Sequence, residues 1–393
     1  MRIVHKSLLN NNFSEKRIKN SFHKEKQRKY GIDILRIFSM INIINLHINL
    51  RTGLLYLNSN NSKFKAIWRL ESFSYFSVDC FGLISGIVGF EKYKFSNLAY
   101  LWFISAFYCV SKHLYLYMKK KINIKSLLLS FFPILIKFHW YVNAYFIMYL
   151  FLPFINLGIK EINKKTFKYL VVFYIFFFSI YYIIGAIFKT EDYNFLLRGY
   201  SSSWLTICYI IGGSFGKYIL ESLDASSCII KTIHIINYIG LSLLSSEIFF
   251  ITKNKLLICY LSPTILFQAI SLVMIFYSIK IKNKFLIKII KFITPLTFSA
   301  TLIHSTLFKI RISLILFLFQ LIKQFNAHFF ILKVYILSII IFIFCILIDY
   351  FRLLLFKVMR IRELCFSLER LFPKLIDRIL EKMIIFYFKN RKK

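Results

Sequence analysis

The amino-acid sequence contains ten stretches of about 20 mostly apolar residues, the length that a helix needs to cross the core of a bilayer. This feature constrains the fold most strongly, because lipid leaves only helices and closed barrels with their backbone polar groups satisfied. The sequence therefore predicts an all-α, polytopic transmembrane helix bundle with about 10 spans. A shorter apolar segment at 124–136 contains Pro133 and is expected to be re-entrant or interfacial. The expected spans are residues 32–50, 72–90, 98–118, 140–158, 167–188, 203–220, 228–250, 256–278, 292–312 and 329–351.

The composition agrees with this class of fold. Of 393 residues, 58% are hydrophobic, yet 53 Lys and Arg face 17 Asp and Glu, for a formal net charge of +36. A soluble chain of this kind would expose large apolar patches, and a disordered chain would be less hydrophobic. A membrane accommodates both features, so membrane lipid is an expected partner. Nucleic acid is not, because the charge is spread over loops and tails rather than a folded groove.

The distribution of basic residues predicts the orientation. With the N-terminus in the cytoplasm, the inner segments hold 34 Lys and Arg and the outer loops hold 16. Positive charge is retained on the cytoplasmic side, so we expect both termini inside and a multi-pass protein of the plasma (inner) membrane. We expect a basic cytoplasmic tail at 1–31, one membrane domain at 32–351 and a basic amphipathic interfacial helix at 352–393.

The first expected span is too polar to face lipid. Asp33 and Arg36 are three residues apart and can pair on one face. Arg36 and His47 are separated by three helical turns, so they share a face about 16 Å apart along the axis. Ionisable residues inside a span are candidates for a functional site. Alternatively, Arg36 could be a snorkelling residue paired with Asp33, and His47 could make only an interhelical hydrogen bond. Three asparagines lie on the opposite side, so the helix must sit inside the bundle: Asn42, Asn45 and Asn49.

Other polar residues are placed to reach the same outer half of the membrane. In the second span, Asp79 shares a face with Gly82 and Gly86, where close helix packing is expected. Asp79 could orient an imidazole or act only as a hydrogen-bonded residue of that seam. In the ninth span His304 belongs to a polar patch.

Aromatic residues open the fourth span from the outer side. They are Trp140, Tyr141 and Tyr145. An aromatic belt at the membrane surface explains the first two as well as a role in substrate binding does. The seven cysteines form no CxxC pair, so we interpret them as small apolar residues and predict no metal site.

Five segments, in order, resemble motifs of the acyltransferase-3 family of integral-membrane O-acyltransferases. Asp33-Ile-Leu-Arg36 followed by His47 is similar to the motif that opens the family's first helix. Many members have an Arg-rich stretch after the second span, where this chain has only Lys92 and Lys94. The resemblance implies a stand-alone membrane domain of this family. The other four segments are Val78–Gly86, Trp140–Asn156, Tyr209–Gly213 and Thr297–His304.

The resemblance implies transfer of an acyl group, expected to be acetyl, from cytoplasmic acyl-CoA to a hydroxyl of a cell-surface or lipid-linked carbohydrate. His47 is then the expected general base and Arg36 the expected contact of acetyl-CoA, which is a co-substrate rather than a permanently bound cofactor. Asp79 is expected as a second catalytic residue, although either Asp79 or His304 could orient His47. Four residues are expected to bind the acceptor: Trp140, Tyr141, Tyr145 and His304.

Two other classes of function stay open on the sequence. A flippase for lipid-linked sugars also needs a polar bundle interior, and a ligand sensor can be built on the same scaffold. Transporters often consist of two related halves with broken helices, and no such halves are evident here. The five-segment resemblance favours an enzyme. The acceptor sugar, the acyl group and the oligomeric state are not predicted.

Overall fold

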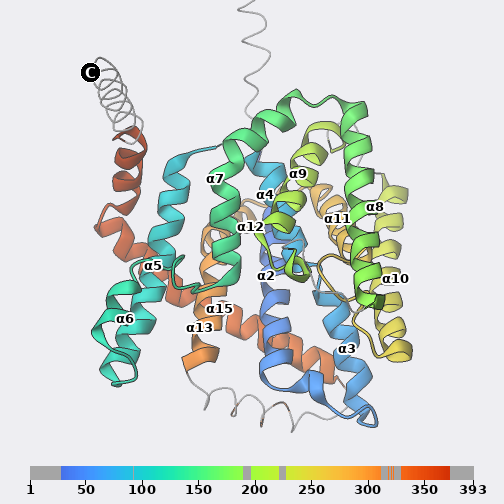
Figure 1. The fold of residues 1–393 in the computed structure, drawn as a ribbon, viewed down its shortest axis with the longest axis horizontal. Helices are drawn as coiled ribbons and strands as arrows, with labels where there is room; N and C mark the ends of the chain where they lie inside the picture. The colour runs from blue at the N-terminus through green and yellow to red at the C-terminus, as the bar shows by residue number, and fades with distance from the viewer. Residues whose placement is uncertain are drawn as a thin grey trace, which may run out of the picture.

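The computed structural model describes residues 28–91, 93–188, 196–220, 227–310 and 329–371, with three single residues between the last two ranges. Most of the two predicted basic tails thus lies outside the described residues. Within them the chain forms α- and 3-10 helices and no strand, gathered in one bundle around α2 (Figure 1). The elements are α2 (Tyr30–Arg51), η1 (Leu54–Tyr56), α3 (Ser62–Ser74), α4 (Ser77–Gly89), α5 (Phe95–Met118), α6 (Ile124–Leu129), α7 (Trp140–Glu161), α8 (Lys164–Phe188), η2 (Leu197–Gly199), α9 (Ser202–Tyr218), α10 (Cys228–Thr252), α11 (Pro263–Tyr277), α12 (Lys284–Ile293), η3 (Thr294–Leu296), α13 (Thr297–Ile310) and α15 (Phe330–Val358).

Seven helical segments of the described chain are long and apolar enough to cross a membrane. Three of the ten expected spans are not among them. Two of these, α9 and α11, have 17 and 15 residues, which is short for a hydrocarbon core of about 30 Å. The third, α5, has 24 residues. The 124–136 segment contains α6, which at six residues cannot span. The all-helical membrane architecture is confirmed, while the number of spans and the orientation stay predictions.

Helix α2 lies at the centre of the bundle, where other helices cover its polar faces (Figure 1). It packs against α3, α4, α11, α13 and α15. The position that its two polar faces predict is therefore confirmed. The asparagines join it to α3 and α15 through three hydrogen bonds: Asn42 Nδ2 to Tyr335 Oη (3.3 Å), Asn45 Nδ2 to Ser74 Oγ (3.0 Å) and Asn49 Nδ2 to Glu71 Oε2 (2.9 Å).

The second expected span begins earlier than its apolar pattern indicates, and it is broken. Helix α3 ends at Ser74 and α4 begins at Ser77, so that the candidate span at residues 63–89 is interrupted. At the break, Ser77 Oγ donates to the Ser74 carbonyl oxygen at 2.6 Å. Non-helical backbone at membrane depth occurs where it is enclosed by protein or lines a cavity. Tyr75, which lies in the break, lines the pocket described below.

Helices α4 and α9 make the most extensive helix contact of the described chain, through glycines. A Cβ on Gly86 would overlap the carbonyl oxygen of Tyr209, and a Cβ on Gly212 would overlap that of Leu83. The backbones therefore approach as closely as only glycine permits, as the glycine spacing of the second span predicts. The two helices run in the same direction, which agrees with two expected spans that both enter from the outer side.

The last long helix, α15, is fixed by a buried ion pair. Arg352 Nη2 lies 2.6 Å from Asp349 Oδ2, and the two side chains are 2% and 0% exposed. Tyr108 of α5 donates to Asp349 Oδ1 at 2.6 Å, and Arg352 donates to Tyr100 Oη at 3.2 Å. Arg352, counted with the basic tail in the sequence, is thus inside the protein. Its partner three residues earlier compensates the charge.

Replacing Gly86 with Ala should lower the free energy of unfolding by about 1–3 kcal/mol, because the added methyl group must displace the α9 backbone. The measurement is denaturant unfolding of the purified protein in detergent. The matched control is Gly240→Ala on α10, where a Cβ would meet nothing within 4 Å. Equal stabilities of the two variants would contradict the close packing of α4 and α9.

Candidate active site

His47 of α2 meets His304 of α13 in the interior of the bundle. His47 Nδ1 lies 2.7 Å from His304 Nε2, and the ring centroids are 4.8 Å apart. His304 is buried, whereas His47 is half-buried and lines a pocket. The structure thus brings together two candidate residues from opposite ends of the sequence.

The hydrogen bonds of His304 indicate which ring nitrogens carry protons. His304 Nδ1 lies 2.5 Å from the Ala300 carbonyl oxygen, which can only accept, so Nδ1 is protonated. In a neutral ring Nε2 then accepts, and His47 Nδ1 is the donor of the bond between the histidines. His47 Nε2 is left as the basic nitrogen. His304 therefore lies at Nδ1 of His47, the position that a carboxylate occupies beside the histidine of a catalytic triad.

Asp79 makes its hydrogen bond to α9. Its Oδ1 accepts from Trp204 Nε1 at 3.0 Å, and its Oδ2 has no hydrogen-bond partner among the described residues. Trp204 packs against the turn at Gly199. A Cβ on Gly199 would be 3.3 Å from Trp204 Cδ1 and would overlap Tyr260 Cβ. Asp79 thus supports the segments that carry Tyr200 and Tyr260.

A pocket of about 380 Å³ opens beside His47, within the usual range for small-ligand sites. Its lining comes from α2, η1, α3, α4, the start of α7 and α13, and from the segments before α7, α9 and α11. Four of the five loops that the charge count places on the outer side contribute to it, so they surround one site. Trp140 and Tyr141 line the pocket as expected, whereas Tyr145 and His304 are not among its lining residues.

One side of the pocket is formed by Tyr75, Trp140, Tyr200 and Tyr260, here called the aromatic wall. Ring centroids are 4.7 Å apart for Trp140 and Tyr200, and 5.0 Å apart for Tyr200 and Tyr260. The ring centroids of Tyr75 and Tyr260 are 4.7 Å apart. A tyrosine hydroxyl is both a donor and an acceptor, so Tyr260 is able to donate a hydrogen bond to a ligand. Such a wall offers apolar faces with polar edges.

Glu71 and His139 also line the pocket, although neither was a candidate from the sequence. Both are buried, at 5% and 7% exposure. Each is placed directly before an expected span, Glu71 before 72–90 and His139 before 140–158. A polar residue that flanks an apolar stretch usually faces water, so its position carried no signal. Glu71 lies on α3, which begins at Ser62, and His139 directly precedes α7, and both side chains are enclosed by the bundle.

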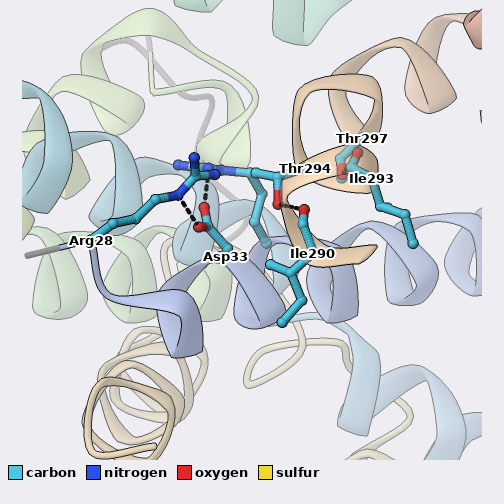
Figure 2. A network of polar contacts seen from close by, with 7 residues as sticks. Arg28, Asp33, Ile290, Ile293, Thr294 and Thr297 are labelled. Atoms are coloured by element: carbon cyan, nitrogen blue, oxygen red, sulfur yellow. Dashed lines mark hydrogen bonds and ion pairs between the residues drawn. The ribbon is translucent and has the colours of Figure 1, made fainter. Parts of the chain in front are cut away.

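Arg36 lies toward the other end of α2. Its Nη1 is 3.1 Å from Asp33 Oδ1, as the spacing of three residues predicts, and Arg28 Nε is 2.7 Å from Asp33 Oδ2. Figure 2 shows this network beside the junction of α12 and α13, and both α12 and η3 pack against α2. Arg36 also interacts electrostatically with the phenols of Tyr141 and Tyr145. It is thus connected to the residues of α7 that lead to the pocket.

Tyrosines of α7 form a row through the bundle. The ring centroids of Tyr141 and Tyr145 are 6.0 Å apart, as are those of Tyr145 and Tyr149. The Tyr149 hydroxyl donates to the Lys94 carbonyl oxygen at 3.0 Å. This tyrosine row extends from the pocket toward the end of the bundle that carries Lys94. Lys92, the other lysine noted there, lies outside the described residues.

No three His, Cys, Asp or Glu residues of the described chain are grouped as ligands of a metal ion. The seven cysteines are free thiols, and six of them are buried. Their apolar surroundings agree with a packing role.

A helical membrane bundle with an oriented histidine pair beside a ligand-sized pocket defines an integral membrane protein with the geometry of an acid–base transfer site. The family model described as Acyltransferase domain, that of the acyltransferase-3 family, matches residues 29–350. The chain therefore belongs to this family and is a membrane acyltransferase. The match includes both histidines and the whole pocket. Comparisons with curated proteins and with solved structures find no match.

Asp79→Asn should retain acyl transfer to within about threefold, because the Asn Oδ1 still accepts from Trp204. Asp79→Leu leaves the buried indole N–H unsatisfied and should raise the acceptor KM about tenfold. Both effects are measured by steady-state kinetics with the acceptor varied. A loss of about a hundredfold in kcat for Asp79→Asn, with the acceptor KM unchanged, would instead show that a charged carboxylate takes part in the chemistry.

Proposed function

We propose that this protein transfers an acetyl group from acetyl-CoA to a hydroxyl of a cell-surface or lipid-linked carbohydrate. The observation that carries the proposal is the oriented pair of His47 and His304 at the edge of a pocket with an aromatic wall. The family membership supplies acyl transfer. The pair supports the role of base, and the aromatic wall supports a sugar as acceptor.

In the proposed reaction His47 Nε2 removes the proton from the acceptor hydroxyl as its oxygen attacks the thioester carbonyl. The tetrahedral intermediate collapses, the carbon–sulfur bond breaks, and the CoA thiolate takes the proton from the imidazolium. His304 holds the His47 ring in the required tautomer throughout. The imidazolium forms beside a neutral His304 rather than a carboxylate, and this favours return of the proton to the thiolate.

The aromatic wall supports carbohydrate binding. Sugar rings present flat C–H faces that pack on aromatic rings, and their hydroxyls are hydrogen-bond partners for Tyr and Trp edges. Trp140 is half-buried, so part of its ring surface is available to a ligand. The aromatic wall and His47 line the same pocket. This supports a sugar that contacts the wall and His47 at the same time.

The donor is proposed to enter from the opposite, basic end of α2. Arg28 and Arg36 share the single carboxylate of Asp33, so their pair of positive charges is only half compensated locally. CoA carries phosphates that suit guanidinium groups. The pantetheine arm would then follow the tyrosine row toward His47, about 16 Å along α2 from Arg36.

Membranes that contain the protein should incorporate label from radioactive acetyl-CoA into glycan. His47→Ala should lower this rate by about 10²–10⁴, the usual contribution of a general base. His304→Ala should lower it by about 10²-fold or less, because the base is kept but misaligned. The matched control is His113→Ala, whose ring contacts its own helix α5. Movement of sugar across the membrane without label would contradict an enzyme and favour a flippase.

Arg36→Gln and Trp140→Ala should separate the two substrates. Loss of a charged contact should raise the acetyl-CoA KM about tenfold for Arg36→Gln, while Arg28 still pairs with Asp33. Loss of a stacking ring should raise the acceptor KM about 2- to 10-fold for Trp140→Ala. The measurement is initial rates with each substrate varied in turn. An effect of Arg36→Gln on the acceptor KM alone would place the donor elsewhere.

A further inference from the structure

Two basic side chains from separate elements lie on the pocket lining. Arg51 ends α2, and Lys255 belongs to the segment between α10 and α11. Both are exposed, and neither forms an ion pair within the described residues. Lysines nearby in the chain, Lys65 and Lys253, are also exposed but do not line the pocket. The pocket thus receives two of the basic residues on this side of the protein.

The carboxylate in the pocket does not neutralise this charge. Glu71 is the one acidic residue among the described lining residues, against two cations. Its Oε2 accepts a hydrogen bond from Asn49 Nδ2 at 2.9 Å, which holds the carboxylate against α2. Lys255 interacts electrostatically with Glu71 and stands over Trp68, with Nζ 4.6 Å from the ring centroid. Arg51 has no such acidic neighbour among the described residues that line the pocket.

Positively charged side chains on the lining of a pocket select ligands by charge. Attraction between charges is stronger near low-dielectric protein than in bulk water, and like charge is excluded by the same field. Such complementarity acts on specificity and on the rate of encounter more than on the affinity of the final complex. The aromatic wall recognises a sugar face regardless of its charge, so the cations add a requirement that the wall does not impose.

We propose that the acceptor is an anionic glycan, whose carboxylate or phosphate group is bound by Arg51 and Lys255 while a neighbouring hydroxyl meets His47. This inference rests on the proposed function. It assigns Arg51 and Lys255 as specificity residues of the acceptor site, distinct from the Arg36 end at which the donor is proposed to bind.

The test uses membranes with the full-length protein, radioactive acetyl-CoA and total glycans from the producing cells, separated on an anion-exchange column after reaction. Label that depends on His47 should appear in the retained, anionic fraction. Arg51→Gln and Lys255→Gln should each raise the KM for that fraction about 2- to 5-fold, the range for solvent-accessible ion pairs, and the double variant about tenfold. Added salt should raise the wild-type KM as screening grows. Mass spectra of the labelled repeat unit distinguish carboxylate from phosphate.

Lys65→Gln and Lys253→Gln are the matched controls, since both remove a positive charge on the same side without touching the pocket. If they raise the KM as much as the pocket variants, the effect is general surface charge and the inference is overturned. Label dependent on His47 in the unretained, neutral fraction also overturns it, but leaves the proposed function intact. No such label in any glycan fraction overturns both.

Discussion

The polar faces of α2 in an apolar medium impose the arrangement on which the other features depend. Lipid offers no hydrogen bonds, so each polar side chain of this helix needs a partner within the protein. The asparagines meet α3 and α15, the arginine meets Asp33, and His47 meets α13. Helices from the first and last thirds of the chain are thereby held around one axis. The same requirement that buries α2 thus assembles the histidine pair.

The site combines residues of packed helices with residues of the segments between helices. His47 and His304 lie on packed helices, which fixes their relative geometry. The aromatic wall comes instead from a helix break, the first turn of α7 and two inter-helix segments. The Asp79–Trp204 bond and the close contact at Gly199 hold two of these segments against α4 and α9. The pocket is thus bounded both by packed helices and by the segments that connect them.

Several site residues were predictable because their type conflicts with their surroundings. Arg36, His47, Asp79 and His304 are ionisable residues inside apolar stretches, and burying them has a cost that marks them. Glu71, His139 and Tyr200 escaped notice because they lie just before apolar stretches, where polar and aromatic residues are ordinary. Tyr260 escaped notice because a tyrosine inside an expected span has no charge that would mark it. The buried pair of Asp349 and Arg352 was missed for a related reason. It falls at the end of an apolar run, where basic residues normally reach water.

The sequence by itself determined that the chain is an all-helical membrane protein, which helix is central and which family it resembles. These follow from local properties: the length of apolar runs, the periodicity of polar residues along one helix and motif order. Only the tertiary structure decided that His47 meets His304 while Asp79 bonds Trp204, that a break separates α3 from α4, and that four separate loops line one pocket. These depend on contacts between residues far apart in the chain, such as His47 and His304. Periodicity within one helix says which face is polar but not which helix will cover it.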